Sequence, residues 1–232
     1  MQTKVVLPYA PILVESTRSI GYSFESALAD IIDNSLGKEA TEINILFSSQ
    51  SSQYVAIVDN GVGMDEEELI MAMRYGSKSS LDIRAKDDLG RFGLGLKTAS
   101  LSQCRKLTVI TKKDDNYNAA CWDLDHIIKL GDWSLICYTG DEAASLPHAG
   151  NLENSSCGTV VVWENFDRIL DGSANSQKVF DEKIEQARAH VSLVFHRFMD
   201  NENIKNRVKI CFNHAPVEPI DPFLTTNPAT QP

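Results

Sequence analysis

The chain has 232 residues, a hydrophobic content of 43% and a formal net charge of −10, which allows a sizeable core and argues against a broad nucleic-acid-binding face. Its five cysteines show no CxxC spacing and its five histidines form no HxxxH or HExxH pair, so neither a disulfide framework nor a zinc site is indicated. The first residues do not resemble a signal peptide and no apolar run reaches membrane-spanning length, so we expect a cytoplasmic protein with no membrane contact.

Taken in chain order, the apolar periodicity predicts helices mixed with strands and shows no internal repeat. The predicted helices lie at residues 12–20, 23–36, 65–73, 93–103 and 178–199. The predicted strands lie at residues 42–47, 53–59, 106–112, 118–122, 133–138, 159–163 and 208–212, with an irregular excursion at 141–156. This order predicts an α/β (α+β) two-layer sandwich, in which helices cover one face of a mixed, mostly antiparallel sheet.

The helix predicted at residues 23–36, SFESALADIIDNSL, organises the rest of the chain. Ser23 is its expected N-cap, and its apolar stripe consists of Phe24, Ala27, Leu28, Ile31 and Ile32. Asp30 and Asn34 are four residues apart, so they share a face that borders this stripe. A carboxylate and a carboxamide at the edge of a core are costly unless they are used, although a solvated helix flank also explains this helix when it is read alone.

Residues 74–92 are polar and have neither a helical nor a strand period. Between residues 74 and 97 six basic residues stand against three acids, which reverses the charge of the chain as a whole. A long loop between regular elements is uncommon unless it is functional. We therefore interpret residues 74–92 as a mobile lid over phosphates, with a solvated loop of mixed charge as the alternative.

Three glycine-containing stretches follow the organising helix. Residues 59–63, DNGVG, end a predicted strand, and Gly61 and Gly63 let the backbone turn without a Cβ. Residues 90–97, GRFGLGLK, open a predicted helix, whose first N–H groups form an anion site. The GxxGxG spacing also occurs in Rossmann and kinase proteins, but no strand directly precedes it here and no βαβ unit surrounds it. Residues 158–159, GT, open the strand TVVVW.

An acidic residue with Asn four positions later, followed by DxGxG, GxxGxG and GT, resembles the ordered signature of the Bergerat ATP-binding fold. The chain thus resembles the GHKL ATPases, which include gyrase B, the large heat-shock chaperones, histidine kinases, MutL and MORC proteins. The resemblance is strongest to MORC-like and chaperone-like prokaryotic ATP-binding proteins. It implies a Bergerat-type ATP-binding domain at residues 1–214. Residues 215–232 hold five of the eight prolines and are expected to be a tail or a linker to a downstream domain.

The resemblance also implies roles for individual residues. Asp59 would accept a hydrogen bond from the adenine amino group, and Thr159 would reach the adenine and Asp59. Asn34 would bind Mg²⁺ together with the ATP phosphates. Asp30 stands where most members have the Glu that orients the attacking water, and it is shorter by one C–C bond, about 1.5 Å. The implied nucleotide contacts are Asn34, Asp59, Gly61, Gly63, Met64, Lys78, Gly90, Arg91, Phe92, Gly93, Leu94, Gly95, Leu96, Lys97 and Thr159.

Three functions follow from the resemblance. The first is a Mg-dependent ATPase, slow as an isolated domain, in which ATP binding closes the lid and drives association with a partner or a second copy. The second is an ATP-gated interaction module with little hydrolysis, because Asp30 is short. The third is a protein kinase of the same fold, although no histidine precedes His126 and an upstream phospho-acceptor helix is therefore missing. The partner, whether protein or DNA, would be reached through the region beyond residue 232.

Overall fold

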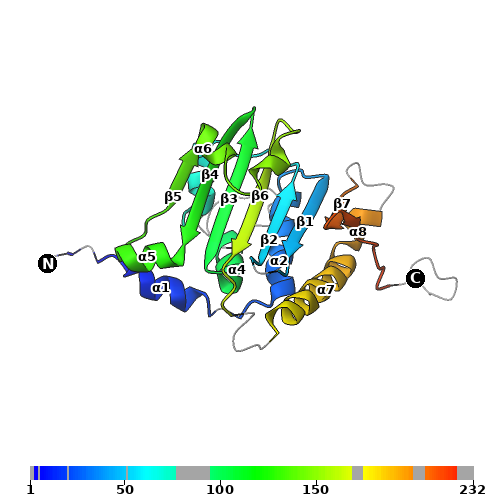
Figure 1. The fold of residues 1–232 in the computed structure, drawn as a ribbon, viewed down its shortest axis with the longest axis horizontal. Coiled ribbons are helices and arrows are strands. Elements are labelled where there is room, and N and C mark those ends of the chain that lie inside the picture. The colour runs from blue at the N-terminus through cyan, green and yellow to red at the C-terminus, as the bar shows by residue number, and fades with distance from the viewer. Residues whose placement is uncertain are drawn as a thin grey trace.

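The computed structural model describes residues 3–4, 6–19, 21–50, 52–76, 95–168, 175–200 and 207–223. Eight strands in these residues form one sheet with the order β5-β4-β3-β6-β2-β1-β7-β8 (Figure 1). The strands are β1 (Glu42–Ser48), β2 (Tyr54–Asp59), β3 (Lys106–Lys113), β4 (Asn116–Asp123), β5 (Ile136–Thr139), β6 (Gly158–Glu164), β7 (Lys209–Phe212) and β8 (Ala215–Pro216). Every neighbouring pair is antiparallel except β1 with β7, which confirms the predicted mixed, mostly antiparallel sheet.

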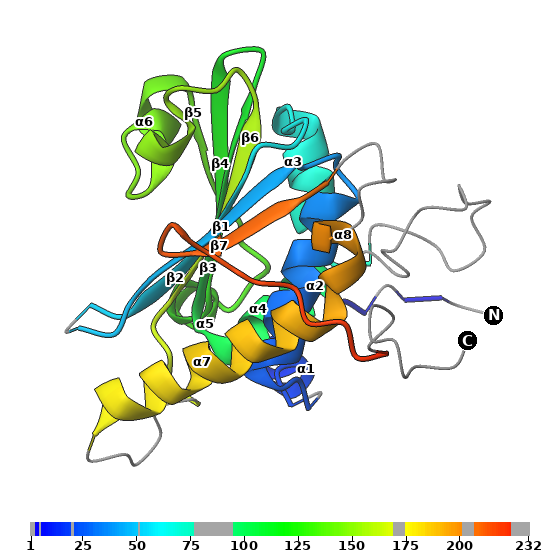
Figure 2. The same cartoon turned by 90° about the vertical axis from the view of Figure 1, so that its right-hand side faces the viewer.

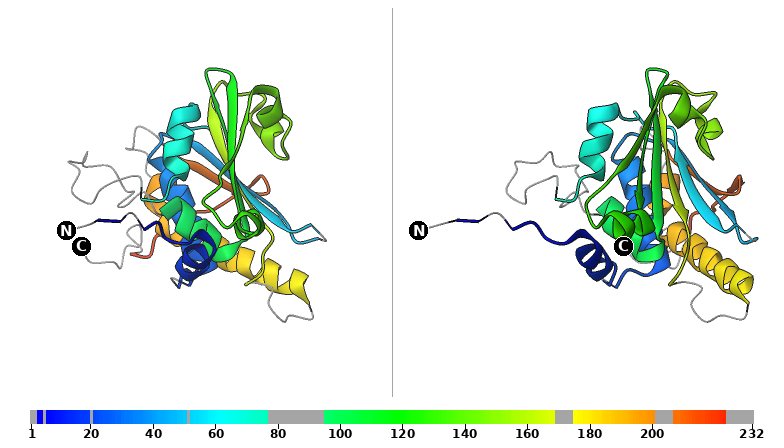
Figure 3. Two further views of the ribbon diagram at one scale, coloured as in Figure 1. Left: turned by 90° about the vertical axis from the view of Figure 1, so that its left-hand side faces the viewer. Right: turned by 60° about the vertical axis from the view of Figure 1, so that its left-hand side comes forward.

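Most of the helices lie on one side of this sheet. The described helices are α1 (Ala10–Thr17), α2 (Phe24–Leu36), α3 (Glu66–Met73), α4 (Gly95–Gln103), α5 (Leu124–Leu130), α6 (Gly140–Ala144), the 3₁₀-helix η1 (Ala149–Leu152), α7 (Ser176–Val194) and α8 (His196–Asp200). Figure 2 shows the sheet nearly edge-on, with α2, α3, α4 and α7 on one side and α6 on the other. In Figure 3 the segment that precedes α1 extends away from the rest of the fold. No described helix combines the length and the apolar character that crossing a membrane requires.

Side chains alternate between the two faces of each strand and so build two cores. On β2, Val55 and Ile57 belong to the larger core beneath the helices, whereas Ala56 belongs to a smaller core on the opposite face. Asp59 continues the row of Val55 and Ile57, because it lies two residues further along the strand. The alternation therefore directs Asp59 towards the helical layer.

Helix α2 forms the centre of the larger core, as its sequence predicts. The Ser23 side chain accepts a hydrogen bond from the Ser26 N–H and caps the helix, and all five residues of the predicted stripe are buried. Phe24 packs edge-on against Trp163 at 5.9 Å between ring centroids. Truncation of a side chain as enclosed as Leu28, which is 0% exposed, would cost about 2–5 kcal/mol. This packing fixes the orientation of the polar face that carries Asp30 and Asn34.

The region between β4 and β6 differs from the sequence-based expectation. The structure has α5 where a plain connection was expected, and β5 is shorter and later than the strand predicted at residues 133–138. Residues 141–156, expected to be irregular, contain α6 and η1, which bury Ala143 and Leu152 against the smaller core. Helices of four to seven residues span at most two turns, so their apolar residues are too few to display a helical period.

The end of the described chain also differs from the prediction. The single helix expected at residues 178–199 is divided at Phe195 into α7 and α8. Beyond residue 214, the Val217 N–H donates to the Ile210 carbonyl (2.9 Å) and the Ile220 N–H donates to the Ser192 carbonyl (3.0 Å). Ordered contacts with β7 and α7 thus continue into the segment for which the sequence predicts a tail. Its role as a linker stays a prediction.

Candidate functional site

Asp59 lies at the end of β2 and is only 6% exposed. One carboxylate oxygen, Oδ2, accepts a hydrogen bond from the Ser35 hydroxyl at 2.7 Å, and the other, Oδ1, accepts one from the Gly61 N–H at 2.9 Å. Burial raises the pKa of Asp59, while hydrogen bonds from Ser35, Gly61 and the Thr159 backbone act in the opposite direction. The protein thus holds a buried acceptor at the end of a strand.

Thr159 lies directly beside Asp59 in the sheet. The register pairs Asp59 with Thr159 and pairs Thr159 with Thr111 on the other side. Side chains that face each other in an antiparallel pair project on the same side of the sheet. Asp59, Thr159 and Thr111 therefore form one row beneath the helical layer, which brings together two of the predicted adenine contacts.

Gly61 and Gly63 occupy positions that leave no space for a side chain. A Cβ at Gly61 would lie 2.7 Å from the Lys38 carbonyl oxygen. A Cβ at Gly63, where φ is +67°, would lie 2.0 Å from the Lys112 carbonyl oxygen. These two glycines are thus required by close approach of the protein's own backbone, a reason that the sequence does not reveal. Met64 follows them and is partly buried against the larger core.

The polar face of α2 lies beside the start of α4. Asp30 is partly buried, Asn34 is exposed, and a Cβ on Gly95 would lie 3.6 Å from the Asp30 Oδ2 atom. The Tyr22 hydroxyl donates a hydrogen bond to Asp30, and the pKa of Tyr22 is raised by burial and by this carboxylate. Burial and the charge of Asp30 raise the pKa of Asp33 to about 6. Asp30 is thus the α2 side chain that lies against the start of α4, and Asp33 and Asn34 follow it within about one helical turn.

Helix α4 begins at Gly95 and continues with Leu96 and Lys97. Leu96 is partly buried against the larger core. Lys97 is 1% exposed, and its Nζ donates to the Ala72 carbonyl oxygen, in the last turn of α3, at 2.6 Å. Burial lowers the pKa of Lys97 to about 8. In this structure Lys97 contacts α3, so its predicted contact with a phosphate would require another position of the side chain.

The remaining predicted contacts, and most of the predicted lid at residues 74–92, lie outside the described residues. They are Lys78, Gly90, Arg91, Phe92, Gly93 and Leu94. Within the described ranges no group of three or more His, Cys, Asp or Glu side chains is placed to hold a metal ion. A hard cation at this site would therefore need oxygen ligands from the phosphates in addition to Asn34.

Sequence reasoning missed two hydroxyl groups at the site. Ser35 falls on the apolar stripe of α2, four residues after Ile31, and a hydroxyl in such a stripe indicates a buried partner. That signal could have identified Ser35 as the donor to Asp59. Thr111 lies in the middle of β3 and carries no comparable signal, because Thr is a common strand residue.

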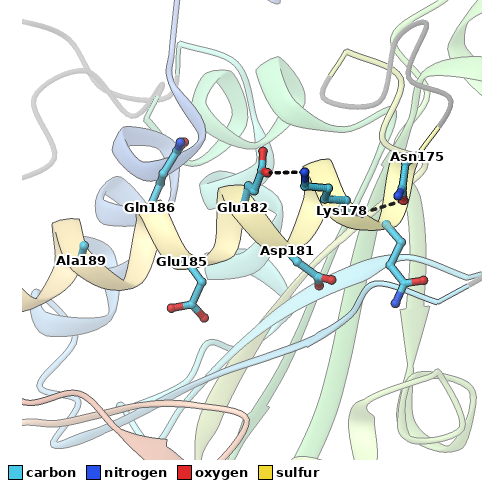
Figure 4. Close-up of a pocket in the computed structure, with 8 residues that line it drawn as sticks. Asn175, Lys178, Asp181, Glu182, Glu185, Gln186 and Ala189 are labelled. Carbon is cyan, nitrogen blue, oxygen red and sulfur yellow. Dashed lines mark hydrogen bonds and ion pairs between the residues drawn. The ribbon is translucent and has the colours of Figure 1, made fainter.

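A separate surface hollow of about 800 Å³ lies along α7. It is lined by Asn175, Gln177, Lys178, Asp181, Glu182, Glu185, Gln186 and Ala189. Figure 4 shows that Glu182 and Gln186 project to one side of the helix, whereas Asp181 and Glu185 project to the other. A single helix with its N-cap lines this hollow, which contains none of the predicted site residues.

Comparison with known proteins identifies a matching protein family and several related proteins. The family described as histidine kinase-, DNA gyrase B-, and HSP90-like ATPase matches residues 22–159. The chain is 32% identical over 90 residues to ATPase morc-1 of Caenorhabditis elegans, which is 38% of this chain and 10% of that protein. It is 34% identical over 93 residues to ATPase MORC2B of Mus musculus, 38% of this chain and 9% of that protein. It is 28% identical over 95 residues to the DNA mismatch repair protein MutL of Rickettsia bellii, 40% of this chain and 16% of that protein. The match therefore spans between 9% and 16% of the length of these relatives.

Proposed function

This chain belongs to the family of histidine kinase-, DNA gyrase B- and HSP90-like ATPases, and we propose that it binds ATP and hydrolyses it slowly. The observation that carries the proposal is the buried carboxylate of Asp59, held by Ser35 and Gly61 next to Thr159. Burying an ionised acceptor is costly, so a site that keeps one suits a ligand that donates to it. The matched region, residues 22–159, contains all of these groups.

The proposed ligand of Asp59 is the adenine amino group. A carboxylate oxygen accepts two hydrogen bonds, so Asp59 can keep Ser35 and Gly61 and still accept one from adenine. Guanine would present a carbonyl oxygen to the same carboxylate and would leave two acceptors facing each other. Preference for ATP over GTP follows from that mismatch.

The phosphates are proposed to lie over the first turn of α4, next to the polar face of α2. Free N–H groups at a helix N-terminus suit anions, and Lys97 belongs to the same turn. The exposed amide oxygen of Asn34 is the residue we assign to Mg²⁺, which would neutralise phosphate charge when bound. An amide oxygen is a hard donor that adds no charge beside the phosphates, which would supply most of the other ligands, so this side chain fits the ion.

Hydrolysis is assigned to Asp30. Its carboxylate would accept a hydrogen bond from a water molecule and orient it towards the γ-phosphorus. The water oxygen forms the new P–O bond, the bond between the γ-phosphorus and the bridging oxygen breaks, and ADP leaves with that electron pair. The proton from water passes to Asp30 and then to solvent.

The wider role is also a proposal. Two of the relatives are named ATPases and one is named a DNA mismatch repair protein, which favours an ATPase over a protein kinase for this chain. We propose that ATP binding promotes association with a second copy or with a protein or DNA partner, in the cytoplasm. An ATP-gated module with little hydrolysis is the second candidate, and the short side chain of Asp30 favours it.

Titration calorimetry with ATP and GTP tests the base assignment. We expect Mg-ATP to bind, GTP to bind more weakly, and Asp59→Asn to weaken ATP binding on the order of 100-fold, because it replaces a charged acceptor. Asp181→Asn, an exposed carboxylate on α7, is the matched control and should bind ATP as the wild type does. Wild-type ATP affinity in a folded Asp59→Asn protein would exclude Asp59 as the adenine contact.

A further inference from the structure

Strand β3 carries two consecutive buried polar side chains that the family signature does not include. Thr111 is 0% exposed and Lys112 is 6% exposed. Because they are neighbours on a strand, they project to opposite faces of the sheet. Thr111 lies in the row with Thr159 and Asp59, whereas Lys112 faces the side that carries η1.

Thr111 links two segments of the proposed base site. Its Oγ1 accepts a hydrogen bond from the Met64 N–H at 2.8 Å and donates one to the Gly158 carbonyl oxygen at 3.1 Å. Met64 directly follows the glycine turn that begins at Asp59, and Gly158 directly precedes Thr159. One hydroxyl group therefore sets the separation between the two segments that carry the proposed adenine contacts.

Lys112 supports the same region from the opposite face. Its Nζ donates to three carbonyl oxygens, those of Ser155 (2.7 Å), Leu152 (3.3 Å) and Glu153 (3.3 Å). The backbone carbonyl of Lys112 also fills the space where a Cβ of Gly63 would lie. Lys112 thus binds the segment that leads into Gly158, while Thr111 binds Gly158 itself, at the end of that segment.

We propose that Thr111 is a positioning residue for base recognition, which aligns the Asp59 and Thr159 segments through its bonds to Met64 and Gly158. The inference rests on the proposed function, because it deepens the assignment of adenine to Asp59. Without the hydroxyl, the Met64 N–H and the Gly158 carbonyl lose a shared buried partner, and each segment can relax separately. Such relaxation should reduce discrimination between bases as well as affinity.

Calorimetry on Thr111→Val, Thr111→Ser and Thr108→Val tests the proposal. Valine keeps the shape and removes the hydroxyl, whereas serine keeps the hydroxyl. Thr108→Val is the matched control, because Thr108 is buried on the same strand at 7% exposure and contacts Cys121 away from the site. We expect Thr111→Val to weaken ATP binding by roughly tenfold and to lower the ratio of ATP to GTP affinity, and Thr111→Ser to restore both.

The possible results separate positioning from general stability. The proposal is supported if both Thr111→Val and Thr108→Val lower the melting temperature equally but only Thr111→Val lowers the ratio of ATP to GTP affinity. An unchanged ratio in Thr111→Val, or an equal change in Thr108→Val, overturns it while leaving the proposed function intact. Wild-type protein that binds no ATP overturns both.

A measurement on the wild type needs no variant. We expect ATP to slow hydrogen exchange of the Met64 amide by at least about tenfold, because the ligand would stabilise the hydrogen bond from the Met64 N–H to Thr111. Amides of α5, the helix that follows β4, should be unaffected. Unchanged exchange at Met64 in protein that binds ATP contradicts the inference.

Discussion

Lys97 donates a 2.6 Å hydrogen bond from its Nζ to the carbonyl oxygen of Ala72 and thereby joins the first turn of α4 to the last turn of α3. A cation at a helix C-terminus interacts favourably with the helix dipole. Burial nevertheless lowers the pKa of Lys97 to about 8, so the charged form is poorly solvated in this position. A phosphate contact would require the Lys97 ammonium to leave the Ala72 carbonyl, and this contact stays a prediction.

The first prediction concerns Lys97→Met. Methionine has a similar length and no charge, so we expect the nucleotide-free protein to keep or gain stability, while ATP affinity falls by at least about tenfold. Urea unfolding and calorimetry measure the two effects. Lys129→Met, an exposed position on α5, is the control. A purely structural Lys97 would give the opposite pattern, with lower stability and unchanged affinity.

The same residue makes both properties depend on pH. The folded pKa is about 8 against an ordinary value of 10.5, so the unfolded chain binds more protons between these values and stability should rise over that window. ATP affinity should fall as pH rises through about 8, because phosphate prefers the charged amine. Lys97→Met should show neither the rise in stability nor the fall in ATP affinity with pH. Urea unfolding and calorimetry at several pH values measure the two.

The second prediction concerns Asp33→Asn. Burial and the charge of Asp30 raise the pKa of Asp33 to about 6. Between its ordinary value near 4 and about 6 the native state binds more protons than the unfolded chain, so stability falls as pH rises through this window. We expect Asp33→Asn to remove this fall and to stabilise the protein at pH 7 by about 1 kcal/mol, a value reduced for partial exposure. Urea unfolding between pH 4 and 7 measures it, and an unchanged pH slope would contradict the assignment.

The third prediction concerns Arg18→Met. Arg18 is 2% exposed, donates to the Leu101 carbonyl at the end of α4 (2.6 Å) and pairs with Asp167 (2.9 Å). Burial alone would raise the pKa of Asp167, but the hydrogen bond and charge of Arg18 lower it. The pair therefore stabilises the fold above about pH 4 and stabilises it less at lower pH. We expect a loss of about 1–2 kcal/mol at pH 7 that shrinks in acid, because the Leu101 carbonyl loses its donor and Asp167, which is partly exposed, keeps only its longer contact with Arg105 (3.4 Å). Lys129→Met, at an exposed position on α5, should leave thermal and urea unfolding unchanged.

The sequence predicted those parts of the molecule whose determinants are local. The stripe of α2 and the hairpin of β1 and β2 follow from periodicity, and Asp59 was expected at the end of its strand, where the structure places it. Asp59 and Thr159 could be predicted together because they match the ordered motifs of the resembled family, and the sheet register places them side by side. Their contact with adenine stays a prediction. Ser35 could also have been found, since its hydroxyl lies on an apolar stripe.

What the sequence did not reveal depends on contacts between distant residues. The partner of Lys97 is a backbone carbonyl 25 positions away, and no side-chain pattern marks a carbonyl. The bridge made by Thr111 spans 47 positions in both directions, to Met64 and to Gly158. Short elements such as α6 form because the sheet offers an apolar surface, which propensity over five residues cannot indicate.

The last prediction is that this chain alone hydrolyses ATP slowly. Asp30 is shorter than the expected Glu by about 1.5 Å, and it already accepts a hydrogen bond from Tyr22 beside Gly95. Its carboxylate must therefore reach further to orient a water molecule, and general-base geometry tolerates little error. We expect turnover below about 1 s⁻¹, the low end of ordinary enzymes.

Steady-state phosphate release at saturating ATP measures this turnover, with Asp30→Asn as the matched variant. Asparagine keeps the size and removes the base, so ATP affinity should persist while phosphate release falls to background. Release that continues at the original rate in Asp30→Asn would assign the base to another residue. Turnover of several per second in the wild type would show that a short carboxylate is sufficient here, and that neither a partner nor a longer side chain is needed to position the water.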